Sequence, residues 1–381
     1  MALTIVRLPS STQIGSFLTQ AAASATYLTK ASASTTYAPI TPTTQTGFRN
    51  LIINGDFRIN QRNFSTAASS GTPSYGFDRW FILSHAENSF ISPQTFSLGN
   101  AIPGYEPTNF LRLDGHQTTK ADAYDVIGQR IENVRTLAGQ QVTISFWAKS
   151  ASGTPNVSIE LNQNFGTGGS PSAEVNTYVN KIALSTSWTR YSTTATIPSI
   201  SGKTIGTTAN TSYLELRIWC QAGSDFNART NSLGNQDNDF DFWGFQIERG
   251  SVASPFEERT IGSELALCQR YYQRLNSSGI TTYDNILAGF AIATNSSVHV
   301  WNLPVQMRSV PTSSISYNAV SVINPAAGTL SDSITLSNNN DNSLNHVYIN
   351  ASSATSPWTA NLPLYLSLKN STSFLAVSAE L

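Results

Sequence analysis

The sequence predicts an all-β protein, with a β-sandwich followed by a smaller C-terminal β domain. Apolar and polar residues alternate in short runs, which is typical of strands that bury one face. Clusters of Gly, Pro and Asn separate these runs without interleaved helices, which favours antiparallel pairing over a parallel βαβ sheet. The first 46 residues differ, because they are rich in Ala, Ser and Thr and hold too little apolar surface for a core.

Residues 1–46 contain a ten-residue repeat. FLTQAAASAT begins at Phe17, YLTKASASTT begins at Tyr27, and a third copy begins at Tyr37. A single copy has almost nothing to bury on itself, so we expect these three aromatic residues to pack against the same residues of other chains. We predict an extended or partly helical stem that stops at the segment from Pro39 to Pro42, since proline removes a backbone donor.

Residues 47–260 are predicted to form the sandwich. Every second residue is apolar in three clear runs, and these residues should face the core. The inward rows are Val142, Ile144, Phe146 and Ala148; Val157, Ile159 and Leu161; and Leu214, Leu216, Ile218 and Cys220. Opposite the last row lie Tyr213, Glu215, Arg217 and Trp219. We therefore expect Trp147, Tyr213 and Trp219 to face solvent or neighbouring chains.

One helical period separates the two β regions. Leu265, Cys268, Tyr272 and Leu275 share one face of a helix, so residues 261–275 are predicted to form a linking helix with Ser263 as its N-cap.

Residues 276–381 are predicted to form the second β domain. The runs that read as strands are Ile286–Ala293, Val298–Leu303, Val347–Asn350, Leu362–Leu368 and Phe374–Leu381. Both faces of the last run carry apolar residues, so another sheet or another chain is expected to cover it.

Composition excludes several classes of partner. Charged residues make up 12% of the 381 residues and the net charge is −1, without a basic stripe that could neutralise phosphates, so we expect no nucleic acid partner. No apolar run approaches the length of a membrane span, and the start lacks a secretory signal, so we expect neither membrane insertion nor export by its own signal. Cys220 and Cys268 do not form a disulfide framework and are predicted to be buried.

No catalytic constellation is recognisable in the sequence. The histidines lie far apart, and GxSxG, HExxH and P-loop patterns are absent. Glu257 and Glu258 are adjacent and would point apart, although glycoside hydrolysis needs two carboxylates a few ångströms from each other. We predict a non-enzymatic protein.

Two signatures frame the middle region. NLIINGDFRINQRN begins at Asn50 and is followed by YGFDRWFI at Tyr75; FDFWGFQIERGSVASPFEERTIGSELALCQRYYQRL begins at Phe240. Together they resemble bacteriophage and prophage tail fibre or receptor-binding proteins, in which this pair brackets a jelly-roll domain similar to carbohydrate-binding modules. The resemblance covers Asn50 to Leu275. Beyond that it rests on PVQMRSVPT at Pro304.

The resemblance implies a homotrimeric virion component. Phe17, Tyr27 and Tyr37 would form successive layers around a threefold axis, the N-terminus would dock on a tail or capsid protein, and the distal β domains would bind host cell-surface polysaccharide. The chain is short for a tail fibre, so two alternatives stay open: a head-fibre or decoration protein without receptor binding, and a polysaccharide depolymerase.

The same resemblance implies a structural calcium ion, since jelly-roll carbohydrate-binding modules often hold one where their first and last strands meet. Asp56, Asp239 and Asp241 are the positions that resemble its ligands, and carboxylates suit this hard cation. The alternative is a solvated turn rich in Asn and Asp. No cofactor is otherwise expected.

Aromatic residues are the predicted glycan contacts. Sugar rings present apolar C–H faces on which Trp and Tyr can stack. Trp80 and Trp243 are interpreted as structural. The candidates for host glycan binding in the distal region are Tyr283, Trp301, Tyr317, Tyr348 and Trp358.

Overall fold

The computed structural model describes residues 49–381 apart from short gaps. The gaps are residues 70, 86–87, 100–101, 116–118, 278–282, 312–314, 326–328, 332–333, 339–341 and 356. Arg49–Leu381 form one compact unit. The predicted stem, with Phe17, Tyr27 and Tyr37, lies outside the described residues.

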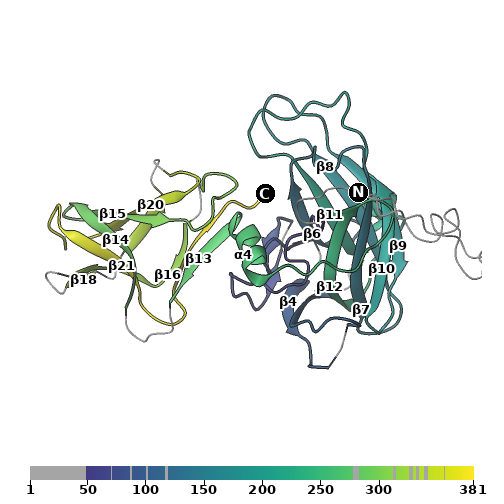
Figure 1. The fold of residues 1–381 in the computed structure, drawn as a ribbon, viewed down its shortest axis with the longest axis horizontal. Coiled ribbons are helices and arrows are strands. Elements are labelled where there is room, and N and C mark those ends of the chain that lie inside the picture. Colours follow the sequence, from purple (N-terminus) through teal and green to yellow (C-terminus); the bar gives the residue numbers. More distant parts are fainter. Residues whose placement is uncertain are drawn as a thin grey trace, which may run out of the picture. The chain divides into compact units, whose positions relative to one another are not determined.

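A jelly-roll β-sandwich of two six-stranded antiparallel sheets forms the first domain (Figure 1). The first sheet has the order β1 (Ala67–Ala68), β4 (Phe90–Thr95), β5 (Asn109–Gly115), β12 (Asn238–Arg249), β7 (Gln141–Ser150) and β10 (Thr189–Thr196). The second sheet has the order β2 (Ser74–Tyr75), β3 (Phe81–Ser84), β6 (Tyr124–Glu132), β11 (Tyr213–Ala222), β8 (Asn156–Asn164) and β9 (Val175–Ala183). The predicted all-β class is confirmed.

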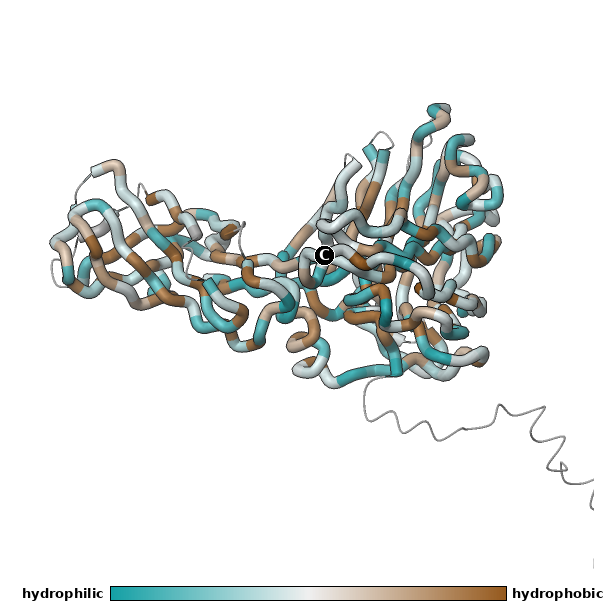
Figure 2. Tube along the Cα trace, turned by 90° about the horizontal axis from the view of Figure 1, so that it is seen from above, coloured by the Kyte–Doolittle hydropathy of each residue, from teal (hydrophilic) through white to brown (hydrophobic). Residues whose placement is uncertain are grey.

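The inward rows predicted from alternation form the core of the sandwich. All of their residues in β7, β8 and β11 are buried. Trp80 is fully buried and donates from Nε1 to the carbonyl oxygen of Asn54 at 2.9 Å, and its ring lies 4.6 Å from that of Phe245. Cys220 and Cys268 are buried and free, as predicted. Hydrophobic and hydrophilic segments alternate along the strands in Figure 2.

Two tryptophans on the outer faces of the sheets are covered by their own chain. Trp147 is 6% exposed beneath the rings of Tyr105 and Trp243. Trp219 is 2% exposed and contacts Phe226, which belongs to a 3-10 turn, η2 (Ser224–Phe226). This turn and the short helix α3 (Asn227–Thr230) were not predicted. The expectation that solvent or neighbouring chains meet these tryptophans is corrected, because connections of the same chain fold back over both sheets.

The linking helix is shorter than predicted. α4 spans Ile261–Gln269, and its N-cap is Thr260, whose side chain accepts from the N–H of Ser263. The predicted end at residue 275 is wrong, because Tyr272–Asn276 form strand β13, which pairs with β22. Strand pairing in the second domain outweighs the weak helical period of this segment.

The C-terminal β domain contains two sheets, and every predicted strand region contains a strand. The three-stranded sheet has the order β13, β22 (Phe374–Ser378) and β16 (Ile315–Asn318). The seven-stranded sheet has the order β18 (Thr329–Ser331), β17 (Val320–Asn324), β21 (Pro363–Leu368), β14 (Asp284–Ala293), β15 (Ser296–Asn302), β20 (His346–Ser353) and β19 (Ile334–Asn338). In β22, Leu375 and Val377 are buried by the domain's own core.

Charged side chains join the two domains at the C-terminal segment. Arg79, which is 1% exposed, pairs with Glu380 and donates to the carbonyl oxygen of Arg130. The Tyr75 hydroxyl donates to the carbonyl oxygen of Leu381 at 3.1 Å. The last residues of the chain therefore lie against the sandwich.

His299 makes the stability of the C-terminal domain depend on pH. It is fully buried, pairs across β14–β15 with Gly289, and lies 3.0 Å from the Ser297 hydroxyl through Nε2. A Cβ on Gly289 would stand 2.4 Å from its Nδ1, so the ring fills the space above that glycine. Burial lowers the pKa of His299 from 6.5 to about 4.

We expect the free energy of unfolding to fall as pH drops from about 6.5 towards 4. In this window the unfolded chain binds a proton at His299 that the folded chain excludes. The difference between the two pKa values of His299 corresponds to about 3 kcal/mol of unfolding free energy. Denaturant unfolding between pH 7.5 and 4.5 measures it. His299→Gln should flatten this part of the profile, and an unchanged slope in the variant would contradict the assignment.

Candidate functional site

The outer face of the second sheet carries a connected set of polar side chains across β6, β11, β8 and β9, which lie side by side in Figure 1. Strand register places Glu215 between Arg130 and Asn162, and Arg217 beside Glu160. We call the set of Arg130, Glu160, Asn162, Glu174, Asn176, Glu215, Arg217 and Arg229 the outer-face network. Glu160, Asn162, Glu215 and Arg217 point away from the inward rows of β8 and β11, whereas Arg229 belongs to α3 and Glu174 precedes β9.

Glu160 is the centre of the network. It is fully buried, and Arg229 donates to both of its carboxylate oxygens at 2.8 and 2.7 Å. Trp219 Nε1 donates to Oε2 at 3.2 Å, and Arg217 lies 3.5 Å from the same atom. A buried carboxylate is tolerated when its charge is paired and its lone pairs are bonded, and Glu160 meets both conditions.

The remaining members extend this arrangement towards the surface. Glu215 is fully buried and pairs with Arg130 and Arg217. Asn162 donates from Nδ2 to Glu174 Oε2 at 3.0 Å and to Asn176 Oδ1 at 2.7 Å. Glu174 and Asn176 are exposed. The face therefore presents fixed donors and acceptors at its surface over a rigid, charge-compensated base.

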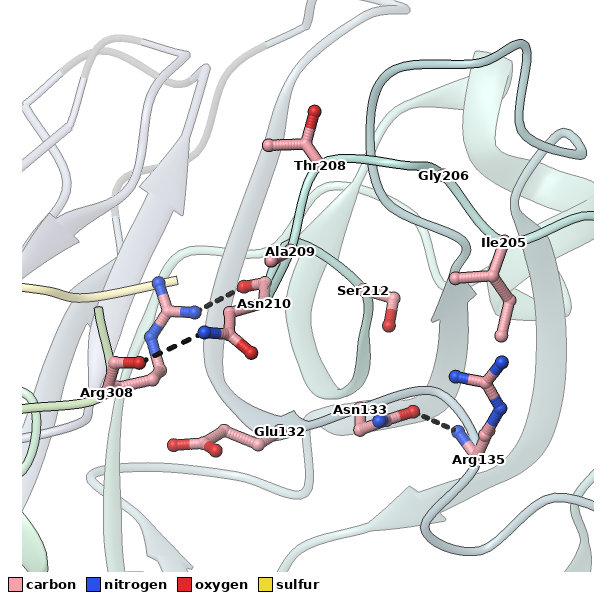
Figure 3. Close-up of a pocket in the computed structure, with 10 residues that line it drawn as sticks. All are labelled: Glu132, Asn133, Arg135, Ile205, Gly206, Thr208, Ala209, Asn210, Ser212 and Arg308. Carbon is pink, nitrogen blue, oxygen red and sulfur yellow. Dashed lines mark hydrogen bonds between the residues drawn. The ribbon is translucent and has the colours of Figure 1, made fainter. Parts of the chain in front are cut away.

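A pocket opens at the edge of the same sheet, where β6 ends and β11 begins. It has a volume of about 290 Å³, near the lower end of the roughly 300–1,000 Å³ common for ligand sites. Its lining combines amides, hydroxyls, two arginines and one carboxylate with two apolar side chains (Figure 3). We call it the edge pocket, and its lining residues are Glu132, Asn133, Arg135, Ile205, Gly206, Thr208, Ala209, Asn210, Ser212 and Arg308.

Hydrogen bonds hold two of the pocket walls in place. Arg270 donates to the Glu132 carboxylate at 2.8 and 2.9 Å. Burial opposes ionisation of Glu132, but the hydrogen bonds from Arg270 and Tyr271 outweigh it and lower its pKa. On the opposite wall, Asn210 Nδ2 donates to the carbonyl oxygen of Arg308 at 3.2 Å, as Figure 3 shows. Glu132 is thus an ionised acceptor held in place, whereas Arg135 is exposed.

Gly206 shapes the pocket through a close backbone approach. A Cβ at this position would lie 2.2 Å from the carbonyl oxygen of Thr167. The two loops are joined by hydrogen bonds from Gly206 N to Phe165 O at 2.8 Å and from Thr208 N to Thr167 O at 3.0 Å. Any side chain at this position would push the loops apart and open the pocket wall.

Sequence reasoning did not single out the edge-pocket residues. The segment TIGTTANTS, starting at Thr204, reads as an ordinary polar turn cluster, and Asn133 follows a strand in the same way. The row of Tyr213, Glu215, Arg217 and Trp219 was predicted to share a face, and it does. Their partners on β6, β8 and α3 follow from strand order and could not be read from the chain.

The predicted glycan residues separate into two groups. Trp301 and Trp358 are each 4% exposed in the core of the C-terminal domain, which corrects their interpretation as contact residues because neither presents a ring face. Tyr283 is 38% exposed. Tyr348 is half-buried against His346, and the half-buried Tyr317 accepts from Leu336 N at 3.2 Å through its hydroxyl. The structure does not gather these residues into a single pocket among the described ones.

The predicted calcium ligands lie in two different charge environments. Asp56 is buried and pairs with Arg58; burial raises its pKa although Arg58 opposes the shift. Arg112 donates to both oxygens of Asp241 at 2.7 and 2.9 Å and lies 3.6 Å from Asp239. Within the part of the chain that the structure describes, no three candidate ligands form a metal-binding group. The calcium site stays a prediction.

Glu257, considered as half of a carboxylate pair, accepts from the backbone N–H groups of Arg49 and Asn50 at 3.1 and 2.7 Å, which closes the sandwich. Among the described residues, no helix has the length and apolar character to cross a bilayer.

Comparison with known proteins finds a family match that covers most of this site. Residues 98–212 match a family described as a carbohydrate binding domain. This segment contains every edge-pocket residue except Arg308, together with the β6, β8 and β9 parts of the outer-face network. No relative was found among the curated proteins.

Several solved structures match part of this chain at low identity and low TM-score. The Clostridium thermocellum endo-1,4-β-D-xylanase 10B, complexed with xylohexaose, is 14% identical over 54% of this chain and 29% of its own, with a TM-score of 0.31. A putative sugar binding protein from Bacteroides thetaiotaomicron is 16% identical over 53% and 100%, with a TM-score of 0.31. Tailspike protein 4 of bacteriophage CBA120 is 10% identical over 53% and 22%, with a TM-score of 0.28. The chain thus spans less than a third of the xylanase and tailspike structures.

Proposed function

We propose that the jelly-roll domain binds a cell-surface polysaccharide through the edge pocket and the adjoining outer face of the second sheet. The observation that carries the proposal is that a preformed polar pocket lies almost wholly within the segment that matches a carbohydrate binding domain. Hydroxyl-rich ligands need several fixed donors and acceptors with some apolar contact, and the pocket supplies both kinds.

Some residues of the edge pocket supply hydrogen-bonding groups and others supply apolar surface. Asn133, Thr208 and Ser212 offer amide and hydroxyl groups for sugar hydroxyls, and Glu132 is an ionised acceptor. Ile205 and Ala209 offer apolar surface for the C–H face of a ring. In the outer-face network, Glu160 and Glu215 are fully buried behind arginines, so neither presents a carboxyl group to a sugar, which favours a binding role without catalysis.

We further propose that this domain is part of a trimeric virion fibre. The ten-residue aromatic repeat and the two signatures at Asn50 and Phe240 support that assignment. Each shallow glycan contact would be weak, but three per trimer and several trimers per particle turn later contacts into intramolecular ones at high effective concentration. The N-terminal arm would dock on a tail or capsid protein.

Gly206→Ala and Thr208→Ala test the binding site. Both variants should lose binding to immobilised capsular and lipopolysaccharide glycans, or to xylohexaose, whichever of these probes the native chain binds. Gly206→Ala should have the larger effect, about tenfold or more, since its Cβ displaces a pocket wall. Thr194→Ala, an exposed threonine on β10 of the other sheet, is the matched control.

Equal binding by all three variants would place the glycan elsewhere, and release of reducing ends from a bound polysaccharide would overturn the non-catalytic role. The fibre assignment is tested by the mass of the full chain in solution. A trimer of about three times 41.1 kDa that dissociates on replacing Tyr27 and Tyr37 with Ser is expected. A stable monomer would contradict it.

A further inference from the structure

A second pocket lies between the sandwich and the C-terminal β domain. It has a volume of about 630 Å³, which is ample for a saccharide of more than one ring. Arg62 and Tyr75 come from the sandwich, and Tyr272, Arg274 and Phe374 come from β13 and β22. We call it the junction pocket. It shares no residue with the edge pocket.

The junction pocket has a positive lining. Two arginines line it, and no Asp or Glu does. The positive charge of Arg62 is compensated by two carboxylates that do not line the pocket, because Glu380 lies 3.1 Å and Asp78 4.0 Å from its guanidinium. Arg274 forms no ion pair with any described residue: its Nη1 donates to the carbonyl oxygen of Arg62, and its buried Nε lacks a hydrogen-bond partner. One guanidinium charge is therefore left for a ligand.

Aromatic rings hold both arginines in position. Arg62 lies over Tyr272 at 3.9 Å and near Tyr75 at 5.2 Å, and Arg274 lies over Phe374 at 4.1 Å. Cation–π contacts of this kind restrict a guanidinium to a plane without consuming its in-plane N–H donors. The pocket thus combines an oriented cation with flat rings, while Asn63 and Ser316 add polar groups at its wall.

We propose that the junction pocket binds an acidic saccharide, with the carboxylate of a uronic-acid-type residue on Arg274 and its ring against the half-buried Phe374 and Tyr75. Guanidinium and carboxylate match in planar geometry, and the pairing is charge-assisted. A single uncompensated cation suits one carboxylate per sugar better than a polyphosphate. This site is additional to the proposed function of the edge pocket and does not depend on it.

Calorimetric titration of the full chain with trigalacturonic acid tests the proposal, with galactotriose as the neutral ligand of similar size. We expect binding of the acid that weakens between 0.05 and 0.5 M NaCl, and at least about tenfold weaker binding by Arg274→Gln. Ser316→Trp, at an exposed lining position, should block the pocket while keeping both arginines. Arg249→Gln, which removes the same charge from an exposed position outside both pockets, is the control.

Several outcomes would overturn the proposal. These are equal binding of the neutral and acidic trisaccharides, equal loss in Arg249→Gln and Arg274→Gln, or full binding by Ser316→Trp. Tighter binding of glucose 6-phosphate than of glucuronate would overturn the carboxylate assignment. Gly206→Ala should still bind trigalacturonic acid, so failure of the edge-pocket proposal and failure of this one give different results. Thermal unfolding of each variant shows whether it is folded.

Discussion

Replacing Arg79 with leucine is expected to lower the free energy of unfolding by about 3–5 kcal/mol, because it removes one partner of a buried ion pair. The guanidinium is fully enclosed: it pairs with Glu380, donates to the carbonyl oxygen of Arg130, and lies 3.4 Å from the Tyr271 ring centre. The nearby Glu380 charge raises the pKa of Arg79 against the opposing effect of burial. Among the residues that the structure describes, leucine would leave the Glu380 carboxylate with Arg62 as its remaining ion-pair partner.

The same substitution should loosen the C-terminal segment from the sandwich. Arg79 belongs to the sandwich and Glu380 to the last residues of the chain, so we expect the two domains to unfold in separate steps in the variant. Denaturant unfolding followed by Trp fluorescence and by near-UV circular dichroism measures this. Arg249→Leu, at an exposed position, is the matched control and should change stability by about 0.5 kcal/mol or less. If Arg79→Leu also lowered the free energy of unfolding by only about 0.5 kcal/mol, the ion pair between Arg79 and Glu380 would contribute little to stability.

Glu160→Gln is the second substitution with a large expected effect, again about 3–5 kcal/mol. The shape of the side chain is kept, but two arginines then face a neutral amide. Its NH₂ group would also meet other donors, because Arg229 donates to both carboxylate oxygens and Trp219 Nε1 to one of them. The variant leaves the part-buried Arg229 facing an amide in place of its carboxylate partner, while Arg217 keeps its pair with Glu215. Losing such an enclosed partner is costlier than losing a surface pair.

Chemical unfolding and glycan binding of Glu160→Gln should be measured together. Because Arg229 also donates to Asn176 Oδ1 at 3.2 Å, loss of its anchor should disturb the exposed part of the outer-face network and weaken glycan binding. Glu258→Gln, at an exposed position, controls for the change of one charge. Native-like stability of Glu160→Gln would contradict the central role of this carboxylate, and unchanged binding would separate the network from the glycan site.

Sequence and structure agree best on which residues of a strand share a face, although most residues on both faces of β7 and β11 are buried. In β7 and β11 the period-two pattern predicted the buried row residue by residue, because each side chain chooses between only two faces. At Tyr272 the prediction failed. A weak helical period continued into a segment that pairs with β22, and long-range pairing decided its conformation.

The candidate sites were harder to predict for the same reason. Asn133 and Asn210 are far apart in sequence and meet only because β6 and β11 are neighbours in the second sheet. Tryptophans in the distal region were predicted to stack on sugars, but an exposed and a buried tryptophan have the same local pattern when the opposing sheet is unknown. Trp301 and Trp358 are buried in the core of their domain.

By itself, the sequence determined the all-β class, the sandwich with its inward rows, the buried free cysteines and the resemblance to carbohydrate-binding modules. These follow from local periodicity and local motifs. Only the tertiary structure decided the end of α4, the covering of Trp147 and Trp219, the arginine partners of Glu160 and Glu215, and both pockets. Each of these depends on which distant strands and loops become neighbours, and that choice is made by burial summed over the whole domain.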